Sequence, residues 1–503
     1  MDAGNPLLPL SVYAAPGYGA AAAGPSAGDD VARWRRALGR FYAQSSARRP
    51  ARTHYYYSRI VQRLRSIVEP NRRVLDLGCG DGTLLAALRP SVGVGVDLDA
   101  HAVRRAAQRH EHLRFMHMAA EDVARLGETF DYVLLSQTLG EIYDLQALFA
   151  SLHAACHPRT RLVIVHYSRV WQPALKLMEW LRIKQASPTE QNWLPTAEVI
   201  HLLDLCGFRT VRTFGMTLAP LWVPLFSAWF NRYLANLPLL DALGLSYVVI
   251  ARPVGARTAA TDPPKSVSIV VPARNEAGNI GPLLSRIPRF ANRQEVIFVE
   301  GGSGDHTWEA IQDAVHNYRG PFRLAALRQD GRGKADAVRK GFAAAGGDVL
   351  MILDADLSVP PEELPRFYEA LCRGQGELVN GSRMVYLMDR KAMRFLNLLG
   401  NRFFGAVFTY LLSQRFRDTL CGTKALLRSD YERIAANRPY FGDFDPFGDF
   451  DLLFGAARLN LEILDVPVHY KARSYGETNI SRFRHGWVLL RMCAVAARKL
   501  KFV

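Results

Sequence analysis

The chain has 503 residues, of which 49% are hydrophobic. This length is too great for one ordinary domain, and the apolar content can supply two separate cores of roughly 200 to 250 residues each. The formal net charge of +16 indicates polyanionic substrates or surroundings, and nucleotide phosphates, nucleic acid or an anionic membrane face would all satisfy it. The 6 cysteines are scattered, which excludes a disulfide-rich fold or a close-paired zinc site and favours a reducing compartment.

Residues 1–28 mix alanine, glycine and proline, which is typical of a flexible tail. They lack the basic start and apolar core of a secretory signal, so we expect a cytoplasmic protein that touches the membrane face at most peripherally. Residues 30–62 are rich in arginine and tyrosine at helical spacing and are expected to cap the first domain.

Apolar strands and amphipathic helices alternate from Arg72 onward, which predicts a parallel, doubly wound α/β sheet within residues 29–252. The expected strands are 74–77, 92–96, 113–116, 132–135 and 162–166, with 208–214 and 247–251 as late strands. The longest uncharged stretch, residues 213–231, contains Gly215, Pro220 and Pro224. We therefore expect a packed insertion or a surface against lipid there, and no membrane-spanning helix.

Glycines follow the first of these strands at alternate positions, as Gly78, Gly80 and Gly82. A backbone needs such residues to turn sharply out of a parallel strand, approach a ligand closely and start a helix, here near Thr83.

Acidic residues accompany this turn. Asp97 ends the next strand, where a carboxylate can accept both hydroxyls of a ribose. A tight turn without a ligand would explain the glycines, but it would not explain Asp76, Asp97 and the later pair Glu121 and Asp122.

The segment Val-Leu-Asp-Leu-Gly-Cys-Gly, residues 74–80, resembles that of the Rossmann-like S-adenosylmethionine-dependent methyltransferases, with the likeness extending over residues 50–252. A dinucleotide is the alternative cofactor, but the spacing is Gly-x-Gly-x-Gly and not Gly-x-Gly-x-x-Gly. The resemblance places Asp76, Gly78 and Gly80 at the methionine part of the cofactor, Asp97 at the ribose, Glu121 or Asp122 at the adenine and Ser136 near the transferred methyl group. His166 and Tyr167 are candidates for the acceptor side, although such residues are more often structural.

Residues 253–265 have linker composition, and a second alternation begins at Ser266. The expected strands of this second α/β domain, residues 266–485, are 267–271, 295–299, 322–326 and 349–353. A basic amphipathic helix, residues 486–503, is expected after it, lying in an anionic membrane interface or docked on the domain.

The last of these strands ends in Asp354-Ala355-Asp356, and two carboxylates at a strand end can bind a divalent cation. Neighbouring strands run into Pro272 to Glu276 and into Glu300, at the sheet edge where such folds bind ligands. Lys334 opens a helix and adds a cation. This combination suits a departing nucleoside diphosphate, whose developing negative charge needs a divalent cation and basic side chains.

These residues resemble family 2 glycosyltransferases of the GT-A fold, and within them the dolichyl-phosphate mannose synthase-like branch. The resemblance implies inverting transfer of a hexose from a nucleotide sugar to a polyprenyl phosphate or glycan acceptor, with Mg²⁺ or Mn²⁺. The nucleotide-sugar residues it implies are Pro272, Arg274, Glu276, Glu300, Asp354, Ala355, Asp356, Arg383 and Arg473, to which the charge argument adds Lys334, and the metal ligands are Asp354, Asp356 and Ser358. The chain departs from the family pattern at several positions: Arg274 stands in place of tyrosine, and Glu300-Gly301 stands in place of two aspartates. These departures leave the identity of the sugar donor undetermined.

Asp449 and Asp451 are, with Asp356, the candidate catalytic residues, because an acceptor hydroxyl needs a base. An acidic helix start stabilised by the helix dipole explains the first two equally well.

We therefore expect a bifunctional methyltransferase and glycosyltransferase. One alternative is a glycosyltransferase whose S-adenosylmethionine-binding domain is regulatory or a scaffold. A second alternative is a nucleic-acid-modifying methyltransferase; we expect no nucleic acid partner, because the Asp354 site explains half of the chain without one. The donor sugar, the methyl target, the order of the reactions and the oligomeric state stay open.

Overall fold

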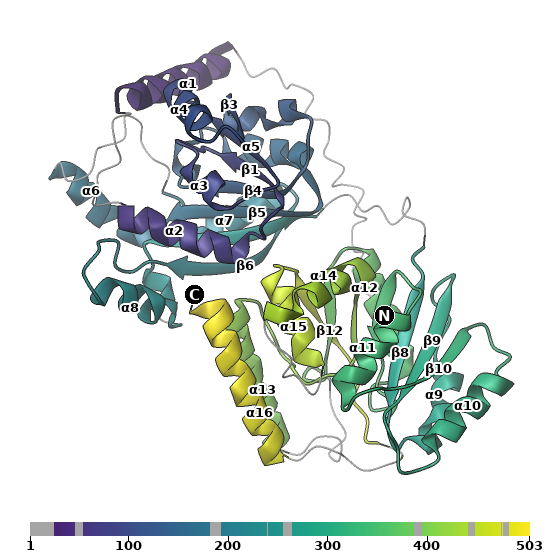
Figure 1. The fold of residues 1–503 in the computed structure, drawn as a ribbon. Coiled ribbons are helices and arrows are strands. Elements are labelled where there is room, and N and C mark those ends of the chain that lie inside the picture. Colours follow the sequence, from purple (N-terminus) through teal and green to yellow (C-terminus); the bar gives the residue numbers. More distant parts are fainter. Residues whose placement is uncertain are drawn as a thin grey trace, which may run out of the picture.

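The computed structural model describes residues 25–45, 54–181, 193–238, 240–254, 264–386, 395–440, 448–473, 475 and 482–502. Figure 1 shows two α/β bodies side by side, the first from purple to teal and the second from green to yellow. Helix α1 (Pro25–Ser45) begins inside the expected tail, so the tail prediction is wrong for residues 25–28, and residues 1–24 lie outside the described part.

The first sheet has 7 strands in the order β3-β2-β1-β4-β5-β7-β6. The strands are β1 (Arg73–Leu77), β2 (Val92–Asp97), β3 (Arg114–His117), β4 (Phe130–Ser136), β5 (Cys156–Tyr167), β6 (Phe208–Met216) and β7 (Ser246–Pro253). Strands β1 to β5 pair in parallel, as expected. Strand β7 is antiparallel to both β5 and β6, a direction that the sequence left open for these late strands. Apolar periodicity does not encode strand direction, which the connections between strands decide.

Helices flank this sheet on both faces (Figure 1). They are α2 (His54–Ile67), α3 (Thr83–Ala87), α4 (Ala100–Arg109), α5 (Leu145–Leu152), α6 (Gln172–Trp180), α7 (Thr196–Leu205) and α8 (Phe226–Arg232). The uncharged stretch 213–231 is divided between β6 and α8, as its glycine and prolines predict. Over the described residues, no helix is both long and apolar enough to cross a membrane.

The second sheet also has 7 strands, in the order β10-β9-β8-β11-β13-β12-β14. The strands are β8 (Val267–Ala273), β9 (Gln294–Glu300), β10 (Arg323–Arg328), β11 (Val349–Ile352), β12 (Leu378–Ser382), β13 (Lys424–Leu427) and β14 (Ile463–Pro467). Strands β8 to β11 are the expected ones, and they pair in parallel. Strand β13 inserts antiparallel between β11 and β12, which the sequence did not reveal.

The helices of the second domain are α9 (Ile280–Arg286), α10 (Thr307–Asn317), α11 (Lys334–Ala344), α12 (Leu364–Cys372), α13 (Phe395–Leu412), α14 (Arg428–Ala436), α15 (Asp449–Arg458) and α16 (Arg482–Ala496). Helix α16 lies beside α13 (Figure 1) and buries Leu489, Met492 and Ala496 in the core of this domain. The expected domain boundary at residue 486 therefore falls inside helix α16. Of the two expected arrangements of the C-terminal helix, the structure has the one in which it is docked on the domain.

The two domains meet along a seam of buried ion pairs. Arg161 of β5 is 3% exposed and donates through Nη2 to both carboxylate oxygens of Glu377, at 2.7 Å each. Arg252 of β7 donates from Nε to Glu462 at 2.6 Å, and Arg433 of α14 reaches back to Glu69 at 2.8 Å. The domains are thus joined by buried charge pairs in addition to the chain between them.

Candidate active sites

The glycine loop after β1 adopts the left-handed backbone that the spacing predicts, with φ of 81° at Gly78, 54° at Gly80 and 73° at Gly82. A Cβ atom on Gly78 would stand 2.3 Å from Oγ1 of Thr138, which itself donates to the Leu77 carbonyl at 3.0 Å. The loop therefore packs directly against the end of β4, and only glycine fits this approach.

Gly78→Ala is expected to lower the free energy of unfolding by about 2 to 5 kcal/mol, the sum of left-handed strain and overpacking. Gly127→Ala is the matched control, because Gly127 has a φ of 64° but nothing within 4 Å of its added Cβ; strain alone costs about 1 to 2 kcal/mol. Urea unfolding of both variants measures the difference, and equal losses would contradict the close packing against Thr138.

Asp97 holds this loop. Its carboxylate accepts hydrogen bonds from the backbone N–H of Gly80 at 2.7 Å and of Asp99 at 2.8 Å. Burial raises the pKa of Asp97, and these two hydrogen bonds oppose that rise. Asp76 lies on the neighbouring strand with 1% exposure. Both carboxylates thus sit at the loop, and their contacts with a cofactor stay a prediction.

The acidic pair Glu121 and Asp122 opens a 3-10 helix (Ala120–Leu126) and faces helix α1. Arg35 of α1 lies 3.6 Å from a carboxylate oxygen of each. The neighbouring Trp34 donates from its indole N–H to the Glu141 carbonyl at 3.2 Å. Helix α1 therefore covers this side of the loop, which agrees with the expected capping role of residues 30–62, although the sequence did not specify these contacts.

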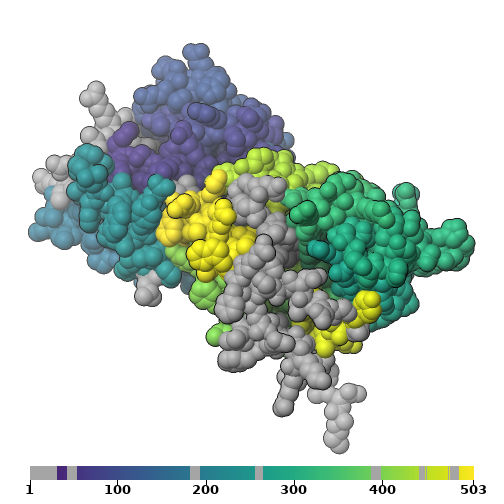
Figure 2. Space-filling view, turned by 60° about the horizontal axis from the view of Figure 1, so that its bottom comes forward, coloured from purple at the N-terminus to yellow at the C-terminus, as the bar shows by residue number. Residues whose placement is uncertain are grey.

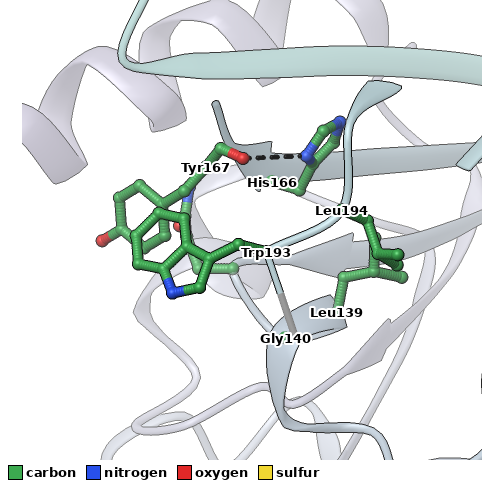
Figure 3. Close-up of a pocket in the computed structure, with 7 residues that line it drawn as sticks. Leu139, Gly140, His166, Tyr167, Trp193 and Leu194 are labelled. Carbon is green, nitrogen blue, oxygen red and sulfur yellow. Dashed lines mark hydrogen bonds between the residues drawn. The ribbon is translucent and has the colours of Figure 1, made fainter. Parts of the chain in front are cut away.

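A small cavity of about 30 Å³ lies where β4 and β5 end (Figure 3). Its lining residues are Gln137, Leu139, Gly140, His166, Tyr167, Trp193 and Leu194. Gln137, which follows Ser136, has a φ of 65° and donates to the Tyr56 hydroxyl at 2.7 Å. The cavity is thus placed beside Ser136, where the sequence predicts the transferred methyl group.

His166 carries a proton-accepting nitrogen in this cavity. Its Nδ1 lies 3.0 Å from the Tyr167 carbonyl, the bond drawn in Figure 3. A carbonyl only accepts, so Nδ1 bears the hydrogen and Nε2, 3.4 Å from the Thr196 hydroxyl, keeps its lone pair. Burial lowers the pKa of His166, which keeps the ring neutral at pH 7. This histidine has the protonation state that a general base requires.

In the second domain, Asp354 and Asp356 follow β11 at the sheet edge and are each held by a cation. Lys334, the first residue of α11, places Nζ 2.5 Å from Asp354, and Arg473 places Nη2 2.7 Å from Asp356. Gly422 closes over the first pair, since a Cβ there would stand 2.2 Å from both the Asp354 carboxylate and Lys334 Nζ. The structure thus brings these predicted residues together.

Glu276 lies at the same edge with 8% exposure and accepts a hydrogen bond from Asn279 at 2.5 Å. Burial raises the pKa of Glu276 to about 7, and the charges of Asp356 and Asp354 act in the same direction. Within the described ranges, no group of three or more His, Cys, Asp or Glu side chains could hold a metal by itself. Two carboxylates nevertheless fit Mg²⁺ or Mn²⁺ in a nucleotide site, where substrate phosphates supply further ligands.

The raised pKa of Glu276 predicts a pH-dependent stability. The folded carboxyl binds its proton more tightly than the unfolded one, so folding loses stability as pH rises from the ordinary value of 4.5 through about 7. Glu276→Gln removes the titrating group and therefore this loss of stability. The free energy of unfolding of Glu276→Gln should exceed that of the wild type most above pH 7, and the difference should shrink toward pH 4.5. Urea unfolding across this range tests it, with Glu309→Gln on the exposed face of α10 as control. A gain independent of pH would contradict the shift.

Arg383, which was expected to contact the phosphates of the donor, is paired with a carboxylate of the protein. Its guanidinium donates to both oxygens of Asp418, at 2.6 and 2.8 Å, and Asp418 is fully buried. Asn401 of α13 donates to the same carboxylate at 2.9 Å. Arg383 therefore fixes the loop that leads to Gly422, and its charge is already balanced. The two residues stand 35 positions apart, and no periodic signal links them.

The remaining predicted residues are distributed around this edge. Pro272 is half-buried, Ala355 is buried and Arg274 is exposed. Glu300 is 5% exposed, and its carboxylate accepts a hydrogen bond from the Ser303 N–H at 2.6 Å. The Ser358 N–H donates to Asp356 at 3.0 Å. Asp451 is paired with Arg438 at 2.7 Å, whereas the side chain of Asp449 lies outside the described residues. Helix α15 still begins at the site, because a Cβ on Gly448 would stand 2.9 Å from Ala335 of α11.

Comparison with known families decides the class of each half. Residues 48–213 match a methyltransferase domain model, and residues 268–434 match the model of glycosyl transferase family 2. The chain is a methyltransferase domain followed by a family 2 glycosyltransferase domain. The two sheets are accordingly Rossmann-like and of the GT-A type, in this order, and the protein is a transferase.

Curated relatives align with the glycosyltransferase half. Undecaprenyl-phosphate 4-deoxy-4-formamido-L-arabinose transferase of Pseudomonas fluorescens (strain SBW25) is 32% identical over 224 residues, 43% of this chain and 61% of the relative. Dolichol-phosphate mannosyltransferase of Pyrococcus furiosus is 37% identical over 121 residues, 24% of this chain and 33% of the relative. The chain therefore spans less than two thirds of the length of either protein. Among solved structures, glucosyl-3-phosphoglycerate synthase of Mycobacterium tuberculosis is 21% identical over 49% of this chain and 83% of that one, with a TM-score of 0.35.

Proposed function

We propose that the C-terminal domain transfers a hexose, with inversion, from a nucleotide sugar to a polyprenyl phosphate or glycan acceptor. The observation that carries this proposal is the pair Asp354 and Asp356 beside the cations Lys334 and Arg473. The two carboxylates would hold Mg²⁺ or Mn²⁺, with Ser358 as a further candidate ligand, and the metal would supply Lewis-acid stabilisation to a departing diphosphate. Lys334 and Arg473 add positive charge where that diphosphate would lie.

The acceptor proposal draws on the relatives. The names of both aligned enzymes state a lipid-linked phosphate, undecaprenyl phosphate in one and dolichol phosphate in the other. A lipid phosphate is already ionised and needs only positioning, which suits a site where Asp451 is already paired. Asp449 stays the candidate base for a hydroxyl acceptor.

The test is a transfer assay by mass spectrometry, with GDP-, UDP- and dTDP-hexoses, Mg²⁺ or Mn²⁺, and vesicles that contain a polyprenyl phosphate. The proposal requires a glycosylated lipid and stoichiometric nucleoside diphosphate with at least one donor. Hydrolysis of the donor without a glycosylated lipid would point to the glycan acceptor, and release of neither product from any donor would overturn the assignment.

We infer that the N-terminal domain binds S-adenosylmethionine at the glycine loop. Gly78, Gly80, Asp76 and Asp97 would contact it, and neutral His166 could accept a proton from a hydroxyl substrate. His166→Asn is then expected to slow methyl transfer by about 10² to 10⁴-fold while cofactor affinity is unchanged. Calorimetric binding of S-adenosylmethionine and the rate of S-adenosylhomocysteine release measure the two effects separately, and a parallel loss of both would show a structural role instead.

The scaffold alternative has one observation in its favour. The cavity beside His166 has a volume of only about 30 Å³, well below that of an ordinary ligand site, so the structure offers no large preformed acceptor pocket at this point of the described chain. A regulatory or scaffold domain would bind the cofactor yet release no S-adenosylhomocysteine with any lipid-linked intermediate of the glycosyltransferase half.

We also infer a cytoplasmic enzyme in peripheral contact with a membrane. Large apolar side chains at and before α8 are exposed: Trp222, Leu225, Phe226 and Trp229. Interfacial binding combines such apolar area with positive charge, and the chain carries +16. Sedimentation with anionic vesicles should fall in a Leu225→Asp/Trp229→Asp variant, and unchanged sedimentation would exclude this surface.

A further inference from the structure

A groove of about 860 Å³ lies between the two domains, and its lining includes none of the predicted site residues of either domain. One wall comes from β6 and the segment before β7, including Asp241, and the other from α13, the loop after it and the C-terminal Lys501. Figure 2 shows the teal part of the first domain directly beside the yellow C-terminal residues. Contacts hold this seam: Arg232 donates to the Phe502 carbonyl at 3.2 Å, and the Tyr410 hydroxyl donates to the Asn236 carbonyl.

The groove carries an excess of positive charge. Arg402, Arg415, Arg417 and Lys501 line it, against the single carboxylate of Asp241. The three arginines are exposed, and among the described residues none of their guanidinium groups has an ion-pair partner. Unpaired guanidinium groups that converge on one concave surface raise the local concentration of anions.

Lys501 gives the groove a buried cation. Its side chain is 3% exposed; Nζ lies 4.8 Å from the centre of the Tyr410 ring and 3.4 Å from the Ser413 hydroxyl. Burial lowers the pKa of Lys501 to about 8, so the amine is still mainly protonated at pH 7. Asp241 offsets this charge only in part, because the buried guanidinium groups of Arg63 and Arg212 add further positive charge near Lys501. A buried ammonium is costly in this position unless an anion compensates it.

We propose that this interdomain groove binds a phosphate-bearing anion. Guanidinium groups match the geometry of phosphate oxygens and bind them with charge-assisted hydrogen bonds. The groove is far larger than one phosphate ion and is of the size of ordinary ligand sites, and Met384 and Phe416 add apolar surface to its lining. The ligand therefore carries a phosphate or diphosphate on a larger group, either a lipid or a soluble molecule. The proposal stands whether or not the chain transfers a sugar.

The test measures the binding of inorganic pyrophosphate to the full chain by calorimetry in metal-free buffer. Every protein in the comparison carries Lys334→Ala, so that pyrophosphate binding at the Asp354 site is weakened equally in all of them. Arg415→Glu/Arg417→Glu is compared with Arg319→Glu/Arg323→Glu, which makes the same charge change at exposed positions of the second domain. We expect at least about a tenfold weaker binding in the first variant, as for loss of hydrogen bonds to a charged group, and little change in the control.

A second arm identifies the source of the phosphate. Sedimentation with vesicles of phosphatidylcholine and phosphatidic acid, using the same proteins, should show the same selective loss if the ligand is a lipid headgroup. If Arg415→Glu/Arg417→Glu weakens only the binding of pyrophosphate, the ligand is a soluble molecule. If it weakens only the binding of vesicles, the ligand is a lipid. Equal losses in the two variants, or no binding in either arm, would overturn the proposal. Circular dichroism and thermal melting verify that both variants fold.

Discussion

Asp356→Asn is expected to lower kcat for sugar transfer on the order of a thousandfold, because a metal-bound diphosphate site contributes several kcal/mol of transition-state stabilisation. The substitution keeps the size of the side chain but removes the charge that pairs with Arg473 at 2.7 Å, and the oxygen that accepts from the Ser358 N–H is retained in the amide. The fold of the loop should therefore survive while the metal-binding charge is lost.

The measurement is steady-state transfer at saturating donor, with thermal melting as a check on folding. Asp313→Asn is the matched control, since Asp313 lies on the exposed side of α10, away from the sheet edge. Asp354→Asn should behave like Asp356→Asn and also replace the ion pair with Lys334 by a weaker neutral contact. Retention of more than about a tenth of the activity in both site variants, a barrier change of only 1.36 kcal/mol, would remove these carboxylates from the mechanism.

Arg161→Met is expected to lower the free energy of unfolding by about 3 to 5 kcal/mol, because removal of one partner deprives a buried carboxylate of its hydrogen-bonded cation. Glu377 is 11% exposed and would keep only the Glu462 N–H at 2.8 Å and the more distant Arg252 at 3.9 Å. Arg161 also donates from Nε to the Asn460 carbonyl at 2.7 Å, so the same change removes a second link between the domains.

Urea unfolding, followed separately in each domain, measures this effect. In the wild type the two domains should unfold together or over nearly the same range of urea concentration. In Arg161→Met the unfolding transitions of the two domains should move apart. Arg161→Met/Glu377→Gln should recover part of the loss, since the buried charge is gone. Arg373→Met breaks an exposed pair with Glu369 and should cost about 0 to 1 kcal/mol. An equally small cost at Arg161 would show that the seam contributes little to the association of the domains.

The parts of the fold that the sequence predicts are those with a local signal. Strands β1, β2, β4, β8 and β11 are mainly apolar segments, and the glycines at 78, 80 and 82 need left-handed backbone that few other residues tolerate. The edge where Asp354 and Asp356 lie follows from the same logic, because the carboxyl ends of parallel strands share one edge of the sheet.

The parts that the sequence does not predict depend on distant partners. The antiparallel direction of β7 and β13 is set by the path of the chain, and apolar runs look the same in both directions. The pairs Arg383 with Asp418 and Arg161 with Glu377 join residues without a common period. Docking of α16 depends on a face of α13 that composition alone does not define.

The most direct test of the central claim is binding of GDP, UDP and dTDP, measured by calorimetry with and without Mn²⁺ or Mg²⁺, on the wild type, Asp356→Asn and Asp313→Asn. We predict that one nucleotide binds in a metal-dependent manner to the wild type and to Asp313→Asn, and that Asp356→Asn loses this binding. Binding of all three nucleotides with equal affinity, without metal and unchanged in Asp356→Asn, would contradict a metal-dependent donor site at the end of β11.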